Sequence, residues 1–198
     1  VGEGGNLGFT MAGRVEYALA GGRLNTDFID NSGGVDMSDH EVNIKILLSP
    51  MVRSGRFTMD QRNAYVRKLT PEVSRFVLAD NDAHGRQISI DQVRSQRDPY
   101  RFGRAIAWIA EQGSPTAAVL GLPTDDELAR RAASRKGPVR PELAVLSSHV
   151  KMHVFKQMKD QDPSVIPEFG ERLLNYFPEA IRADFPKEVA AHLLRSEE

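Results

Sequence analysis

Apolar positions along most of the chain recur at helical spacing. The clearest stripe follows Pro141 and comprises Leu143, Leu146, Val150, Val154 and Met158. Residues three or four positions apart lie on the same face of an α-helix. The stripe therefore predicts a long amphipathic helix, which we expect to end at Asp162–Pro163 because proline cannot continue a helix.

Signals for further helix starts divide the region after residue 37. A hydroxyl residue followed three positions later by Glu or Gln marks a capping box, and this pattern begins at Ser38 and Thr58. Further starts are predicted at Pro71, at Ser89 or Asp91, near Tyr100 and at Thr124, with a loop over 114–123 and short closing helices after Pro178 and Pro186. Residues 38–198 are thus expected to be all-helical.

The segment that follows Ser38 has two possible interpretations. The residues Val42, Ile44, Ile46 and Leu48 alternate as in a strand. Ile44, Leu47 and Leu48 instead have the spacing of a helix. The capping box favours a helix, which we expect to end near Pro50.

Residues 1–37 show a different pattern. They indicate strand, turn, a short helix over 11–20, a second strand over 23–28 and another turn. Two Gly-rich polar segments, 2–10 and 30–38, are typical of ligand-facing loops at the carboxyl edge of a parallel sheet, because glycine lets a ligand approach the main chain closely. The predicted fold class is mainly α, with a remnant of a Rossmann-like α/β nucleotide-binding domain at residues 1–37.

Composition narrows the function classes. The 198 residues allow one domain or a domain with an appendage, and the formal charge of −1 gives no electrostatic case for nucleic acid or an anionic membrane. There is no cysteine, which excludes thiolate chemistry and disulfides. No membrane-length apolar run or signal segment is present, so we expect a cytoplasmic location. Because Val1 leads directly into a Gly-rich turn, the chain is expected to be a piece of a longer polypeptide.

Three residues in the Gly-rich segments are candidates for ligand binding. The side-chain amides of Asn6 and Asn31 can donate to and accept from a polar ligand, but asparagine also forms turns by itself. The Ser38 hydroxyl, at an expected helix start, suits a carboxylate, but it equally suits a plain N-cap. The residues alone leave both interpretations open at each position.

Three clusters of charged or histidine residues could indicate metal or nucleic-acid binding, but each has a simpler interpretation. Asp36, Asp39, His40 and Glu41 could form a metal cluster, although acidic residues are also expected in a first helical turn. His149 and His153 have the spacing of two zinc ligands without a third, and we expect no metal. A basic patch is formed by Arg130, Arg131, Arg135 and Lys136, for which a helix C-terminus and solvent are the simpler interpretation.

Several blocks resemble one enzyme family. GEGGNLGFT, GGRLNTDFIDNSGGVD and SDHEVNIKILL resemble the end of the nucleotide-binding domain of the large bacterial NAD-dependent glutamate dehydrogenases, and LPTDDELARR, RPELAVLSSHVK and NYFPEAI extend the resemblance in the family's order. The resemblance implies that 1–47 is the end of an NAD-binding domain with its exit helix. Residues 48–198 would be a helical C-terminal domain.

The resemblance also implies residue roles. Asn6 and Asn31 match asparagines near the nicotinamide of NAD, and Ser38 matches a serine that binds the distal carboxylate of L-glutamate. The family's catalytic Lys and Asp have no match here, so the chain alone is expected to be inactive. The parent protein is expected to deaminate L-glutamate oxidatively to 2-oxoglutarate and ammonia, with hydride transfer to NAD, and to be a homo-oligomer. Without the resemblance, a non-enzymatic helical interaction scaffold would be favoured.

Overall fold

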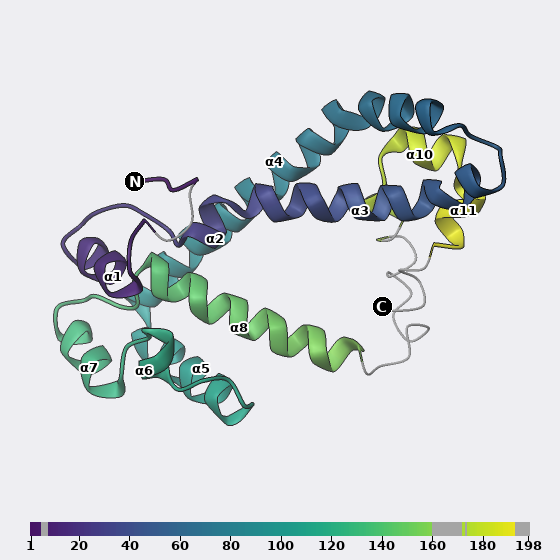
Figure 1. Ribbon diagram of the computed structural model, residues 1–198. Helices are drawn as coiled ribbons and strands as arrows, with labels where there is room; N and C mark the ends of the chain where they lie inside the picture. The colour runs from purple at the N-terminus through teal and green to yellow at the C-terminus, as the bar shows by residue number, and fades with distance from the viewer. Residues whose placement is uncertain (5–7, 160–171, 173, 193–198) are drawn as a thin grey trace. The chain divides into compact units, whose positions relative to one another are not determined.

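The described part of the chain is built from helices. The computed structural model describes residues 1–4, 8–159, 172 and 174–192, and within these ranges there are helices but no strand (Figure 1). The mainly α prediction is therefore confirmed. In the same ranges, no helix combines the length and the apolar character that crossing a membrane requires.

The chain forms two compact units. The first consists of residues 1–32 and 81–156, and the second of residues 33–80 and 157–198. The first contains α1 (Met11–Leu19), α2 (Asp27–Asp30), α5 (Pro99–Glu111), α6 (Ala117–Leu120), α7 (Asp125–Ala133) and most of α8 (Arg140–Lys159). The second contains most of α3 (Ser32–Arg53), α10 (Glu179–Asp184) and α11 (Pro186–Ala190). Helix α4 (Met59–Arg97) contributes to both.

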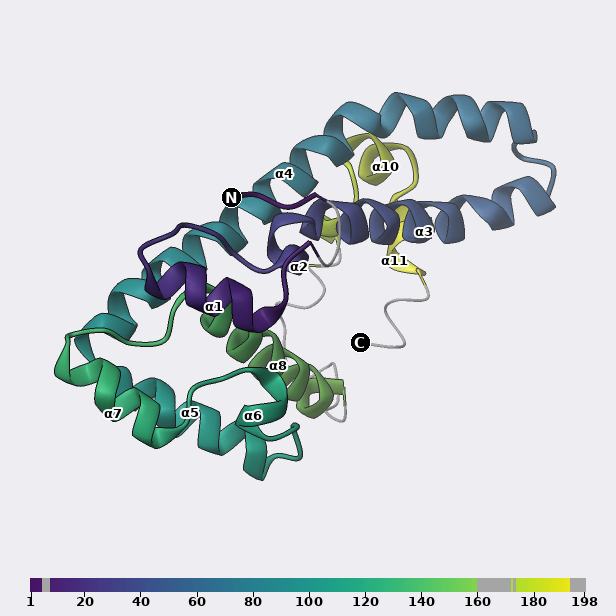
Figure 2. The same cartoon turned by 60° about the vertical axis from the view of Figure 1, so that its left-hand side comes forward.

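The first unit has two small apolar clusters. Ile106 and Ile109 of α5 pack with Leu122 and with Leu146 of α8. Ile88 of α4 packs with Leu143 and Ala144, also of α8. Figure 2 shows α5 and α6 beside α8, as these contacts require. The N-terminal half of the predicted α8 stripe is thus buried, whereas Val154 in its C-terminal half is 42% exposed.

A close backbone approach fixes the segment before α8. A Cβ atom added at Gly137 would overlap the carbonyl group of Ser95. The Ser95 side chain is fully buried, and its hydroxyl donates to the carbonyl of Pro138 at 3.0 Å. Glycine at 137 therefore allows two backbone segments to touch, a role that a side chain would prevent.

The second unit has one larger apolar core. Side chains of α3 and α4 pack against those at the start of α10, between α10 and α11, and within α11. The buried members are Ile44, Leu47, Leu48, Met51, Leu69, Val73, Val77, Phe177, Ile181, Phe185 and Val189. Figures 1 and 2 both show α10 beside the hairpin of α3 and α4. Burial of these side chains is the main stabilising term of this unit.

Several predicted helix starts are confirmed by their caps. Thr58 and Gln61 form a reciprocal capping box: the Thr58 hydroxyl accepts from the Gln61 amide at 3.2 Å, and the Gln61 side chain accepts from the Thr58 amide at 2.8 Å. The Thr124 hydroxyl accepts from the Glu127 amide at 3.3 Å and begins α7. The predicted helices at 11–20 and near 100–112 are also present.

The predicted strand at 23–28 is wrong. Residues 22–26 have no regular secondary structure, and Asp27–Asp30 form α2. A strand requires a partner to satisfy its backbone groups, and the described residues offer none. The predicted turn over 30–38 is also wrong, because Gly33 and Gly34 lie inside the first turns of α3. The Rossmann-like remnant is therefore not confirmed.

Four predicted helix boundaries and one predicted loop differ from the structure. Ser38 and Pro50 both lie within α3, while Pro71 and the Ser89–Asp91 segment lie within α4. A proline inside a helix removes a hydrogen bond, but the apolar core compensates, since Leu69 and Val73 on either side of Pro71 are buried. Tertiary packing thus overrides the local stop signals. The predicted loop over 114–123 contains the short helix α6.

Candidate functional site

Asn31 lies at the junction between α2 and α3. It is the C-cap of α2, and its backbone amide donates to the carbonyl of Asp27 at 2.7 Å. The side chain of Asn81 on α4 donates to the Ile29 carbonyl at 3.0 Å and to the Ser32 hydroxyl at 2.8 Å. The backbone on both sides of Asn31 is therefore held by hydrogen bonds. These bonds fix the position from which the half-buried Asn31 side chain extends.

Ser38 is not the N-cap that its sequence pattern predicts. Its exposed hydroxyl lies inside α3 and donates to the carbonyls of Gly34 at 2.9 Å and Val35 at 3.1 Å. A serine in a helix interior commonly bonds back in this way. To donate to a carboxylate, the hydroxyl would have to rotate away from these carbonyls. Asn6 lies outside the described residues, and Asn31 and Ser38 belong to different units.

A polar network joins the two Gly-rich segments within the first unit. The backbone amide of Glu3 donates to the Asp30 carboxylate at 3.0 Å, and the Asn25 side chain donates to the same carboxylate at 2.8 Å. Arg14 is 3% exposed, forms an ion pair with Glu3 and donates to the Asn25 carbonyl at 2.9 Å. Glu3, in the first Gly-rich segment, therefore contacts Asp30, the residue that precedes Asn31 in the second segment.

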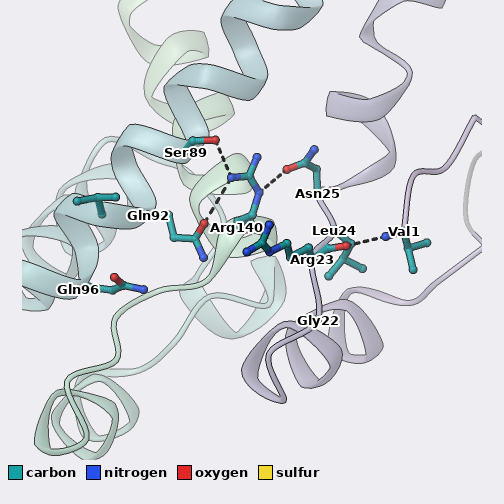
Figure 3. A pocket seen from close by; sticks show the side chains of 10 residues that line it. Val1, Gly22, Arg23, Leu24, Asn25, Ser89, Gln92, Gln96 and Arg140 are labelled. Carbon is teal, nitrogen blue, oxygen red and sulfur yellow. Dashed lines mark hydrogen bonds between the residues drawn. The ribbon is translucent and has the colours of Figure 1, made fainter.

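A polar pocket lies beside this network (Figure 3). Its volume is about 630 Å³, and its polar lining residues are Arg23, Asn25, Ser89, Gln92, Gln96 and Arg140. The lining comes from the segment after α1, from α4 and from the start of α8. Two guanidinium groups and several amides are donors that suit an anionic or amide-bearing ligand.

Arg140 is the best-positioned side chain of the pocket. Its Nε donates to Asn25 Oδ1 at 2.8 Å and one terminal nitrogen donates to Ser89 Oγ at 2.9 Å, as Figure 3 shows. Burial lowers the pKa of Arg140, Asp30 opposes this change, and nearby Arg23 reinforces it. The arginine is bonded to neutral acceptors rather than to a carboxylate, so bound negative charge would be favoured. Periodicity could not reveal this residue, because its partner Asn25 lies 115 positions away.

A buried ion pair near the pocket was also missed by sequence reasoning. Arg131 donates to both carboxylate oxygens of Glu142, at 2.7 and 3.0 Å, and Glu142 accepts from the Val139 amide at 2.8 Å. Burial raises the pKa of Glu142, while Arg131 opposes that change. The expectation that the basic patch faces solvent is therefore wrong for Arg131, whose side chain is 8% exposed.

The histidine pair on α8 has local partners. His149 Nδ1 lies 3.2 Å from Ser114 Oγ, and the His153 ring packs edge-on against Trp108 with centroids 4.8 Å apart. Among the four residues weighed as a metal cluster, Asp39 accepts from the Tyr176 hydroxyl at 2.6 Å and Glu41 pairs with Lys45. Lys45 lowers the pKa of Glu41 by hydrogen bond and charge.

Comparisons with known proteins identify the family. The family described as bacterial NAD-glutamate dehydrogenase, catalytic domain, matches residues 1–91, and the one described as glutamate dehydrogenase, C-terminal, matches residues 135–197. The chain belongs to the bacterial NAD-glutamate dehydrogenase family.

Curated relatives agree over the whole chain. NAD-specific glutamate dehydrogenases from Mycobacterium tuberculosis, Pseudomonas aeruginosa and Halomonas elongata are 39%, 40% and 40% identical to all of it. The chain spans 12% of the length of each of these relatives. It therefore corresponds to one segment of these relatives: the catalytic-domain family matches its first part, and the C-terminal family matches its last part.

Proposed function

We propose that this chain is the part of an NAD-dependent glutamate dehydrogenase that completes the nicotinamide side of the active site. The parent protein would oxidatively deaminate L-glutamate to 2-oxoglutarate and ammonia, with hydride transfer from the α-carbon to NAD. The observation that carries this proposal is the match of the catalytic-domain family to residues 1–91, together with about 40% identity to NAD-specific glutamate dehydrogenases along the whole chain.

The cofactor carries the redox chemistry, and the protein binds and orients it. We assign Asn6 and Asn31 to hydrogen bonds with the nicotinamide side of NAD. The contact between Glu3 and Asp30 supports this assignment, because it joins the described parts of the two segments that carry these asparagines. The side-chain amide of Asn31 makes no hydrogen bond with another described residue, so it is available to a ligand.

Ser38 is assigned to the distal carboxylate of glutamate. Its exposure and its position early in α3 support this role, and its present bonds to backbone carbonyls would have to be exchanged for a bond to the substrate. We further propose that residues 1–47 complete the NAD-binding domain and residues 48–198 form a helical C-terminal domain. The parent would act in the cytoplasm as a homo-oligomer.

The site assignment is tested in a chain extended upstream to include the catalytic domain. Asn31→Ala should raise KM for NAD about tenfold, as expected for the loss of a hydrogen bond of about 1.4 kcal/mol. Asn63→Ala on α4 is the matched control, because among the described residues the Asn63 side chain bonds only to its neighbour Arg62. This variant should leave KM unchanged. Equal KM values for both variants would remove Asn31 from the cofactor site.

The chain by itself is expected to be catalytically silent, because no segment matches the family's catalytic Lys and Asp. Incubation with L-glutamate and NAD should give no NADH absorbance. NADH production by the 198-residue chain would contradict this expectation. The rival function is a helical interaction scaffold without catalysis. It is supported if neither Asn6→Ala nor Asn31→Ala changes cofactor affinity or turnover in the extended chain.

A further inference from the structure

Three potential metal-binding side chains meet where α3 and α4 pair within the second unit. Asp36 and His40 lie one turn apart on α3, and Asp80 belongs to α4. One ligand atom from each residue lies within 4.8 Å of the other two. We propose that Asp36, His40 and Asp80 bind a divalent transition-metal ion. This proposal is independent of the dehydrogenase assignment.

Helix geometry accounts for the convergence of these residues. Gly33 of α3 faces Val77 of α4 so closely that an added Cβ would lie 3.2 Å from Val77 Cγ1. Asp36 and Asp80 each follow this contact by three residues, about one turn. Side chains on a helix lean towards its N-terminus, so on the antiparallel arms of this hairpin both carboxylates lean back towards the same crossing point.

His40 supplies a second, independent observation. Its side chain is 3% exposed, and neither ring nitrogen is hydrogen-bonded to a described residue. Nε2 faces Asp36 Oδ1 at 3.8 Å, which is too long for a hydrogen bond. The ring is held in place by stacking on Tyr176, with centroids 4.6 Å apart, and by Phe76 at 5.8 Å. Buried polar groups normally have partners, and an ion held with Asp36 and Asp80 supplies one.

Two neighbouring acids on α3 have other partners. Asp39 is bonded to Tyr176, and Glu41 to Lys45. The carboxylates of Asp36 and Asp80 repel each other at this separation, and a bound cation relieves that repulsion. Imidazole nitrogen with carboxylate oxygen suits Zn²⁺ among the common ions, and three protein ligands leave a position for water. The side chains must close in slightly on the ion, since ligand atoms around zinc lie about 3.3 Å apart.

Titration of the purified chain with Zn²⁺ alone, by calorimetry in excess Mg²⁺, tests the proposal. Wild type should bind Zn²⁺, and Asp80→Asn should weaken binding at least about tenfold. Asp82→Asn is the matched control, because Asp82 is also exposed and pairs with Arg86 on α4. Its affinity should stay within about twofold of wild type. Zn²⁺ should also raise the melting temperature of wild type and Asp82→Asn more than that of Asp80→Asn.

Two histidine variants locate the bound ion. His40→Gln should abolish Zn²⁺ binding, and circular dichroism checks that this variant folds. If it does not fold, the comparison of Asp80→Asn with Asp82→Asn still tests the proposal, because Asp80 is exposed. His153→Gln separates the cluster from the His149–His153 pair, which could bind zinc on its own. The proposal is overturned if wild type binds no Zn²⁺, if Asp80→Asn and Asp82→Asn bind equally, or if binding is lost only in His153→Gln.

Discussion

The two units are stabilised in different ways. The second unit has one continuous apolar core of eleven buried side chains from α3, α4, α11 and the region of α10. The first unit has two smaller apolar clusters and, between its elements, buried polar contacts such as Arg131 with Glu142 and Arg14 with Glu3. Apolar cores lose stability in proportion to the volume removed, whereas a buried ion pair becomes costly when one partner is lost.

Phe177→Ala should have the largest effect, because this side chain is fully buried in the core of the second unit. The loss of unfolding free energy should be about 3–5 kcal/mol by urea denaturation. Leu78→Ala is the control in the same unit, since Leu78 is 70% exposed, and it should change stability by less than about 0.5 kcal/mol. Similar losses for both variants would mean that this core does not dominate the unit.

Arg131→Met should cost about 3 kcal/mol, because Glu142 would be left buried and unpaired. The exposed neighbour variant Arg130→Met should be almost neutral. Adding Glu142→Leu to Arg131→Met should restore most of the stability. Urea denaturation of wild type, Arg131→Met, Glu142→Leu and the double variant measures the coupling. A double variant as unstable as Arg131→Met would show that shape rather than charge matters here.

The same ion pair leads to a prediction about how the stability cost of Arg131→Met depends on pH. Burial raises the pKa of Glu142 above its unfolded value, and removal of Arg131 removes the main opposing effect. The folded variant then binds more protons than its unfolded state, so its stability is greatest below the ordinary pKa of the carboxyl and is lost as the pH rises. The cost of Arg131→Met should therefore be smaller near about pH 4 than at about pH 7. An equal cost at both pH values would argue against a buried charge.

Tyr176→Phe should cost about 1 kcal/mol, the usual value of a hydrogen bond. The Tyr176 hydroxyl donates to Asp39 and accepts from Asn43 at 2.9 Å, and burial raises the pKa of Tyr176, which keeps the phenol protonated at neutral pH. Tyr100→Phe, at a 56% exposed position, is the control for urea denaturation. If the two variants are equally stable, this polar contact adds nothing to the apolar core.

Glu188→Gln should have the smallest effect, about 0–1 kcal/mol. The partly exposed ion pair with Arg56 lowers the pKa of Glu188 from its ordinary value of 4.5. Its contribution is present above that value and is lost as the pH falls through the lowered pKa. Thermal melting at low and high salt should show the difference from wild type shrinking with salt. A salt-independent difference would point to packing instead.

Periodicity predicted the helical character of the chain because apolar faces and caps are local signals. Thr58 and Thr124 marked true helix starts, since a capping hydroxyl needs only residues three positions away. Ser38 and Pro71 misled for the same reason: their local signals were overridden by packing between distant segments of the second unit.

The candidate sites were less predictable because their contacts are long-range. The family resemblance supplied Asn6, Asn31 and Ser38, which no spacing rule would select. Arg140 and Asp80 went unnoticed, since each meets its partners only after folding, across 115 positions for Arg140 and Asn25 and between two helices for Asp80 and His40. Sequence reasoning did single out Asp36 and His40, but together with two neighbours that have other partners.

The contact of Gly137 with Ser95 has a consequence for sequence variation. Any other amino acid at position 137 would push the backbone before α8 away from α4. The start of α8, with Arg140 and Glu142, would move with it. In a saturation mutagenesis library selected for folding, this position should accept glycine alone, while the exposed Lys136 beside it should tolerate most replacements.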